Sequence, residues 1–143
     1  MTYFIGLKDT QQSSGLTTGE QFVTACCGSE ISVGNCVYVA SINNMEYYVS
    51  KSDITDALTM PSIGVVVEKN STSYCKVQLS GAASGICNNL AIGKTLFVGF
   101  DGLITQIPPK PNENSIFLQI MGVSIGINVI LISPQFNMTK LIS

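Results

Sequence analysis

The sequence predicts an all-β protein: a small β-barrel or β-sandwich built from two pseudo-repeated halves, with an extended N-terminal arm. Apolar and polar residues alternate along most segments, which is typical of half-buried strands. No window combines apolar residues at helical spacing with good capping residues. Similar motifs occur in both halves of the chain, which indicates an internal repeat. The 143 residues fit one domain, which can bury roughly two-thirds of its unfolded surface.

Eight or nine segments have the length and composition of short strands. Asn43-Asn44 forms a turn between two of them, and Asp101-Gly102 is a strong hairpin signal. A single helical turn over 52–58 is the weak exception, with Ser52 as its expected cap ahead of Pro61. The expected strands cover residues 22–27, 31–40, 46–50, 63–68, 75–80, 95–100, 103–107, 116–124 and 128–133.

The internal repeat relates residues of about 31–80 to residues 90–133. The stretch ISVGNCVYVA at 31–40 recurs as LAIGKTLFVG at 90–99, and SIGVVV at 62–67 recurs as IMGVSI at 120–125. Neither half holds enough strands to cover its own apolar face, so the two should close into one barrel or sandwich. We expect the repeated glycines to mark bends where a strand turns the corner of a barrel.

Residues 1–20 differ in composition from the single β domain predicted at 21–143. They contain the polar, weakly patterned runs QQSSG and TTG, which predict an N-terminal arm that is ordered only against a partner. A second unusual stretch, 108–114, holds three prolines and is predicted to be a stiff exposed connection, because proline is barred from a sheet interior.

The composition argues against an enzyme and against nucleic-acid binding. The chain has no histidine, arginine or tryptophan, so histidine-based catalysis, the commonest metal ligand and bidentate phosphate recognition are all missing. Seven lysines against nine acidic residues cannot form a basic face. Charged residues make up only 11% of the chain, which predicts that neighbouring subunits cover part of its surface. We predict no catalytic residues, no cofactor and no metal.

Two motifs look like ligand sites but lack the necessary context. The tripeptide GKT at 93–95 resembles the end of a phosphate-binding loop, yet the required earlier glycine is Asn88 and a strand follows. Asp53 and Asp56 lack the ligand spacing of a calcium loop, so a solvated loop is expected there.

The five cysteines do not have the pattern of a secreted disulfide framework, and synthesis in a reducing cytoplasm is expected. Their odd number includes an adjacent pair, Cys26 and Cys27, which should point to opposite faces of a strand. Cys75 is expected to be a small buried apolar residue. The N-terminus has no secretory signal pattern. The uncharged run 116–132 is shorter than the ~20 residues of a membrane-spanning helix and reads better as two buried strands, so no membrane partner is expected.

Motifs over residues 34–134, most of the chain, keep a moderately specific order and spacing. They are GxxVYV at 34–39, Asp53 with Asp56-Ala57, MPSIGVV at 60–66, VQLSG at 77–81, GxxLFV at 93–98, DGLIT at 101–105, Pro108-Pro109, QIMGV at 119–123 and NVILISP at 128–134. In this arrangement the chain resembles small β-rich virion proteins of tailed bacteriophages. That family includes capsid decoration (cement) proteins and β-domains of head or tail fibres, without catalysis.

The resemblance implies a decoration protein that binds the outside of the assembled capsid, with the major capsid protein as its partner and a homotrimer as its expected assembly. It would be assembled in the host cytoplasm and reside on the capsid exterior of the virion. The arm would add a strand to a neighbouring sheet edge or lie along the shell, so deleting residues 1–20 should weaken attachment. Its expected capsid-binding residues are Thr2, Tyr3, Phe4, Ile5, Leu7 and Leu16.

Two other functions remain open at this point. A tail or fibre module would contact other virion proteins or a host saccharide, with Tyr47, Tyr48 and Tyr74 as candidate aromatic contacts. These tyrosines are more readily explained as packing or interface residues. For an enzyme, cleavage of a glycoside by a carboxylate pair is the only chemistry that the residues permit, and we predict that the protein is not an enzyme.

Overall fold

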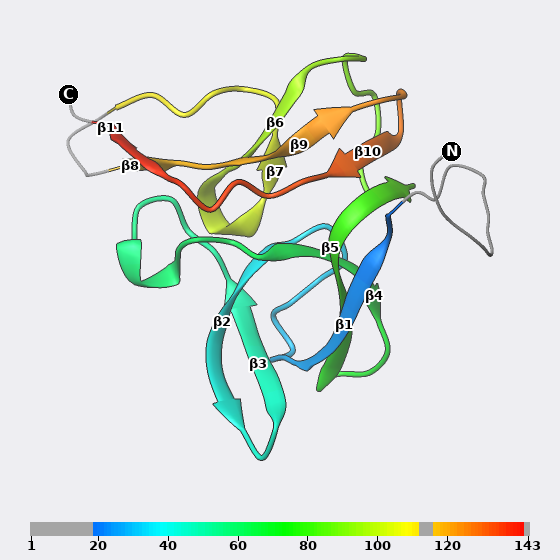
Figure 1. The fold of residues 1–143 in the computed structure, drawn as a ribbon, viewed down its shortest axis with the longest axis vertical. Coiled ribbons are helices and arrows are strands. Elements are labelled where there is room, and N and C mark those ends of the chain that lie inside the picture. The colour runs from blue at the N-terminus through cyan, green and yellow to red at the C-terminus, as the bar shows by residue number, and fades with distance from the viewer. Residues whose placement is uncertain (1–18, 112–115, 142–143) are drawn as a thin grey trace, which may run out of the picture.

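A computed structural model describes residues 19–111 and 116–141 of the protein, which are all-β as predicted. They form eleven strands and two short 3-10 helices (Figure 1). The strands are β1 (Gln21–Cys26), β2 (Cys36–Asn43), β3 (Glu46–Lys51), β4 (Gly64–Lys69), β5 (Tyr74–Ser84), β6 (Thr95–Val98), β7 (Ile104–Thr105), β8 (Ile116–Leu118), β9 (Ile120–Ser124), β10 (Val129–Ile132) and β11 (Thr139–Leu141).

The first five strands close into a small barrel in the order β1-β3-β2-β4-β5, with β5 pairing back onto β1. The long strand β5 belongs to two layers, because its residues up to Ser80 pair with β1 and its last residues pair with β10. The strands β10, β9, β6 and β7 continue from there as a second layer, drawn above the barrel in Figure 1. The strands β8 and β11 form a separate two-stranded ribbon.

The two halves use the same strand pairings, as the repeated motifs predict. In the first half β2 pairs with β3 and β4, and β4 pairs with β5; in the second half β6 pairs with β7 and β9, and β9 pairs with β10. The register is equivalent too: Val37 lies opposite Gly64, and Leu96 lies opposite Gly122. The two halves differ because the first closes into a barrel, whereas within the described residues β7 of the second half does not pair back onto β5.

Gly64 and Gly122 occupy equivalent positions in the two halves. Their role differs from the one predicted, which was to bend a strand at the corner of a barrel. A Cβ atom on Gly64 would overlap the carbonyl oxygen of Gln78, and one on Gly122 would overlap that of Leu131. Gln78 and Leu131 occupy equivalent places on the next strand of each half. The repeated glycine is therefore required by the close approach of two backbones within the sheet.

Apolar side chains form two cores, one on each face of β4. Because successive strand residues point to opposite faces, Val66 faces the barrel interior and Val65 faces the space between the barrel and the second layer. The barrel core consists of Ala25, Ile31, Val37, Val49, Val66, Cys75 and Val77. The interlayer core consists of Cys36, Ile54, Met60, Val65, Ala83, Leu96, Val98, Ile116, Met121, Ile130 and Ile132.

Two local predictions were wrong, and one strand was missed. The stretch 31–35 is a turn instead of the start of a strand, because the side chain of Asn35 accepts a hydrogen bond from the backbone N–H of Ser32 (2.8 Å). The helical turn is Ala57–Thr59, and Asp56 caps it through the N–H of Leu58 (3.0 Å). Strand β11 had no sequence prediction at all.

The apolar run 116–132 forms strands, in line with its β-branched composition, but there are three of them, β8, β9 and β10, instead of the two that were predicted. Among the residues that the structure describes, no helix has the length and apolar character that would let it span a membrane.

Candidate functional site

One end of the barrel is closed by the turn between β1 and β2. Ile31 lies in this turn with its side chain in the barrel core. The ammonium group of Lys69, at the end of β4, donates hydrogen bonds to the carbonyl oxygens of Gly28 (2.8 Å) and Ile31 (2.9 Å). The turn is thereby held across this end of the barrel, so any site inside the barrel must be entered from the other end.

The opposite end of the barrel is open and holds a cavity of about 480 Å³, which we call the barrel mouth. Val23 and Leu79 lie in it because they continue the inward-facing rows of Ala25 on β1 and Val77 on β5. Of the residues that the structure describes, none in this lining carries a carboxylate, ammonium group or thiol. It consists of Gln21, Val23, Val39, Tyr47, Ile63, Leu79, Ser80, Ser133, Pro134 and Phe136.

The wall of the barrel is incomplete next to the mouth. Strands β1 and β3 pair at a single position, Cys26 with Tyr48, near the closed end. The N–H of Cys27 donates to the carbonyl of Ser73 (2.9 Å), and hydrogen-bonded residues alternate along an antiparallel ladder. The backbone groups of Phe22 and Thr24 therefore point away from β5, toward the seam between β1 and β3.

A second apolar groove, of about 430 Å³, lies along β7 and the proline-rich connection that follows it. Phe100, Leu103 and Ile107 line it together with Pro108 and Pro109, so the proline-rich connection serves as one of its walls. Lys110 is the one charged residue among the described residues of its lining. Both grooves are therefore suited to apolar partners rather than to charged ligands.

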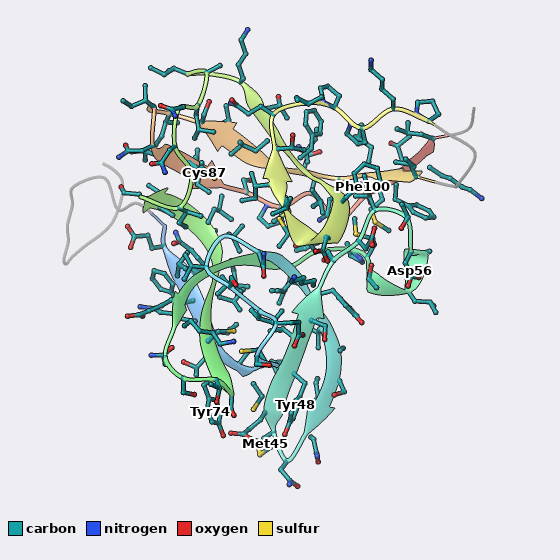
Figure 2. All side chains as sticks on the ribbon, turned by 180° about the vertical axis from the view of Figure 1, so that it is seen from behind. Met45, Tyr48, Asp56, Tyr74, Cys87 and Phe100 are labelled. Atoms are coloured by element: carbon teal, nitrogen blue, oxygen red, sulfur yellow. The ribbon has the colours of Figure 1, made fainter. Side chains whose placement is uncertain are left out.

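Tyr48 and Tyr74 lie on either side of Cys26 on β1. They form a polar cluster outside the barrel with Cys26 and Glu46. The thiol of Cys26 donates to Oε1 of Glu46 (3.6 Å). The nearby Cys26 thiol and Glu46 carboxylate raise the pKa of Tyr48, and Glu46 and Cys26 likewise raise the pKa of Tyr74. Figure 2 shows Tyr48 and Tyr74 at the end of the molecule far from the second layer.

The sequence favoured packing roles for Tyr47, Tyr48 and Tyr74. In the structure these tyrosines do not share one site. Tyr48 and Tyr74 are 39% and 41% exposed, so each presents a large part of its side chain to solvent. Tyr47 is equally exposed (42%), but it points the other way along β3 and lines the barrel mouth. Tyr47 and Tyr48 diverge because successive strand residues point to opposite faces, and the pairing across β1 brings Tyr48 and Tyr74 together.

The aspartates that the sequence analysis considered for calcium accept hydrogen bonds from their own loop. One carboxylate oxygen of Asp53 accepts from the backbone N–H (2.9 Å) and the hydroxyl (2.8 Å) of Thr55, and Asp56 caps the helical turn. Within the described ranges, no group of three or more potential metal ligands is gathered. The predicted arm residues Thr2, Tyr3, Phe4, Ile5, Leu7 and Leu16 lie outside the described residues.

All five cysteines are free, and Cys26, Cys36 and Cys75 are buried. Burial raises the pKa of the Cys75 thiol to about 12, and burial together with the neighbouring Cys87 raises the pKa of Cys36. Both thiols therefore stay protonated and unreactive in the folded protein under mildly alkaline conditions. Their environment fits the expected role of Cys75 as a small apolar core residue.

We expect the free energy of unfolding to fall as the pH rises above 9, the ordinary thiol pKa. Above that value the unfolded chain ionises Cys36 and Cys75 while the folded protein keeps them neutral, so the unfolded state gains stability. At pH 10 each thiol should account for about 1.4 kcal/mol. Urea unfolding under reducing conditions at pH 8 and pH 10 measures the loss. The double variant Cys36→Ala, Cys75→Ala should lose much less between these pH values, and an equal loss would contradict the assignment.

Fold and surface together define an all-β protein with a closed small barrel, a second layer and two grooves lined by apolar side chains. No protein-family model, curated protein or solved structure matches this chain.

Proposed function

We propose that the protein is a non-catalytic structural protein of a tailed-phage virion, a decoration (cement) protein that binds the outer surface of the assembled capsid. The observation that carries the proposal is the amount of apolar side chain exposed on a chain with few charges. Among residues 19–111 and 116–141, sixteen large apolar residues are at least 36% exposed, and Met45 and Leu58 are exposed by 95% and 87%. Such surface is typical of proteins that are covered by partners.

The mechanism is physical rather than chemical. Each copy bridges neighbouring capsid subunits, so its apolar contacts exist only in the assembled lattice and add their binding free energy to that state. The β2–β3 hairpin, with Ile42 and Met45 near its tip, projects from the barrel and is suited to such a contact (Figure 1). The arm residues would contribute further contacts, and a homotrimer would place three such surfaces on one shell site.

The copy number of the protein per particle tests the proposal. Quantitative mass spectrometry of purified particles should give a simple ratio to the major capsid protein, such as one or one third. A handful of copies per particle would instead place the protein at the tail, the portal vertex or a fibre. Absence from the particles would overturn the virion assignment.

Removing residues 1–18 is expected to weaken capsid attachment at least about tenfold, because it removes the apolar arm residues. The cut spares Gly19, whose carbonyl accepts a hydrogen bond from the Ser80 hydroxyl (2.7 Å), so the barrel keeps this contact. Binding to undecorated capsids is measured by co-sedimentation, and far-UV circular dichroism checks that the truncated protein is folded. A folded truncated protein that binds as tightly as the full chain would refute the arm's role.

The exposed tyrosine pair favours a second candidate function, a tail or fibre module that binds a host saccharide. Tyr48 and Tyr74 offer aromatic faces and hydroxyls beside the acceptor Glu46, which suits a polyhydroxyl ligand. Glycan-array binding that is lost in Tyr48→Ala and in Tyr74→Ala would support this function. Tyr47→Ala is the matched control, since Tyr47 lines the barrel mouth and should leave such binding intact.

A further inference from the structure

The barrel mouth has the properties of a binding site for an apolar peptide segment. Its volume of about 480 Å³ lies within the range of roughly 300–1,000 Å³ that ligand pockets occupy. Apolar side chains from four strands line it together with Ile63, Pro134 and Phe136, and its described lining residues carry no charge. The seam between β1 and β3 opens beside it, and the backbone groups of Phe22 and Thr24 face that seam. Exposed strand edges of this kind readily accept another strand.

The described part of the chain begins at Gly19, at the rim of the barrel mouth. Gly19 accepts a hydrogen bond from Ser80, and both Ser80 and Gln21 belong to the mouth lining. Residues 8–18 separate Leu7 from Gly19, and eleven residues reach up to about 36 Å when extended. That length is sufficient for the chain to turn back and bring residues 2–7 into the mouth.

Residues 2–7 have the pattern that the mouth requires. In an extended segment Tyr3, Ile5 and Leu7 share one face, and the segment carries no charge before Lys8. The residues closer to the barrel, 11–18, contain only Leu16 as a large apolar residue, so a direct hairpin onto β1 would not fill the mouth.

We propose that the barrel mouth binds residues 2–7 of the same chain, which enter the seam beside β1 as an added strand and place Tyr3, Ile5 and Leu7 in the mouth. The same chain is favoured over a second copy because the short connection gives the segment a millimolar effective concentration. The inference goes beyond the proposed function and holds whether or not the protein binds a capsid. In a decoration protein, the segment would have to leave the mouth before it reached the shell.

Tryptophan fluorescence of the full chain tests this proposal, because the natural sequence contains no tryptophan. In the variant Tyr3→Trp, emission should be blue-shifted from that of the urea-unfolded chain, and acrylamide quenching should be several-fold weaker than in the unfolded chain. The matched variant Phe4→Trp places the reporter on the opposite face of the segment and should be quenched more readily. A Tyr3→Trp signal equal to that of the unfolded chain would overturn the proposal.

A rim substitution then locates the binding site. Phe136 lines the mouth and is 60% exposed, so Phe136→Asp, made in the Tyr3→Trp background, should release the reporter without unfolding the barrel. Phe100 is 53% exposed and lines the second groove, so Phe100→Asp is the control that should leave the signal unchanged. If Phe100→Asp released the tryptophan reporter and Phe136→Asp did not, the assignment of the binding site to the mouth would be overturned.

The dependence on protein concentration distinguishes the same chain from a second copy. We expect the blue shift to persist on dilution, down to concentrations at which the mass by light scattering is that of a monomer. A blue shift that disappears on dilution together with a dimer or trimer would mean that a neighbouring copy supplies the segment, and would overturn binding within one chain. The fluorescence readout does not depend on capsid attachment. A failure of the proposed binding of residues 2–7 can therefore be distinguished from a failure of the proposed function.

Discussion

Replacing Gly122 by alanine is expected to lower the free energy of unfolding by about 3 kcal/mol or more. The added Cβ would overlap the carbonyl oxygen of Leu131 on the paired strand β10, so one of the two backbones must move. Gly122 also has a φ of +151°, a conformation that alanine adopts only with strain. Overpacking and backbone strain each cost about 1–3 kcal/mol.

Urea unfolding followed by far-UV circular dichroism measures this effect. Gly64→Ala should behave similarly, because its Cβ would overlap the carbonyl of Gln78 at the equivalent position of the repeat. Gly126→Ala is the matched control, since the nearest atom to its Cβ is a side-chain methyl of Val129 at 3.3 Å. A Gly122→Ala protein as stable as Gly126→Ala would contradict the proposed role of the repeated glycine.

Replacing Gln119 by leucine is expected to cost about 2–4 kcal/mol. Gln119 is completely buried between the barrel and the second layer, and its amide forms two hydrogen bonds with one backbone residue. Its Oε1 accepts from the N–H of Ser62 (2.7 Å), and its Nε2 donates to the carbonyl of Ser62 (2.8 Å). Leucine leaves both buried groups of Ser62 without partners, at about 1–3 kcal/mol each.

Two further variants separate the loss of these hydrogen bonds from other effects. Gln119→Glu keeps the shape of the side chain but replaces the donor nitrogen by an oxygen, so it should also be destabilising. Gln106→Leu is the control: Gln106 also bonds a backbone N–H and carbonyl, both of Ala91, at an exposed site where water can replace the amide, and it donates one further hydrogen bond to the Ser124 hydroxyl (3.2 Å). A Gln119→Leu variant within about 0.5 kcal/mol of Gln106→Leu would contradict the prediction.

The strands that the sequence predicted best are those with clear alternation and flanking turns. The hairpin over Asn43-Asn44 and the apolar stretches that became β4 and β10 are examples. The prediction failed over 31–35, where alternating apolar residues lie in a turn held by the side chain of Asn35. It also failed at β11, which has three residues and exists through its pairing with β8. Local patterns do not record such distant pairings.

The candidate site was predicted less well than the fold. Composition indicated apolar interaction surfaces, but no local signal located them. The barrel mouth collects residues from Gln21 to Phe136, and the tyrosine pair depends on β1 lying between β3 and β5. The glycines at 64 and 122 were recognised through the repeat, yet their physical role needed the position of the next strand's carbonyl.

The sequence by itself determined the all-β class and the equivalence of the two halves, because alternation and repeated motifs are local properties that each strand carries with it. Only the tertiary structure decided that the first half closes into a barrel while the second does not close within the described residues. That difference depends on the contact of Cys26 with Tyr48, which lie 22 positions apart in the chain. It also decided that one end of the barrel is sealed and the other open, since closure is a property of how strand ends meet in space.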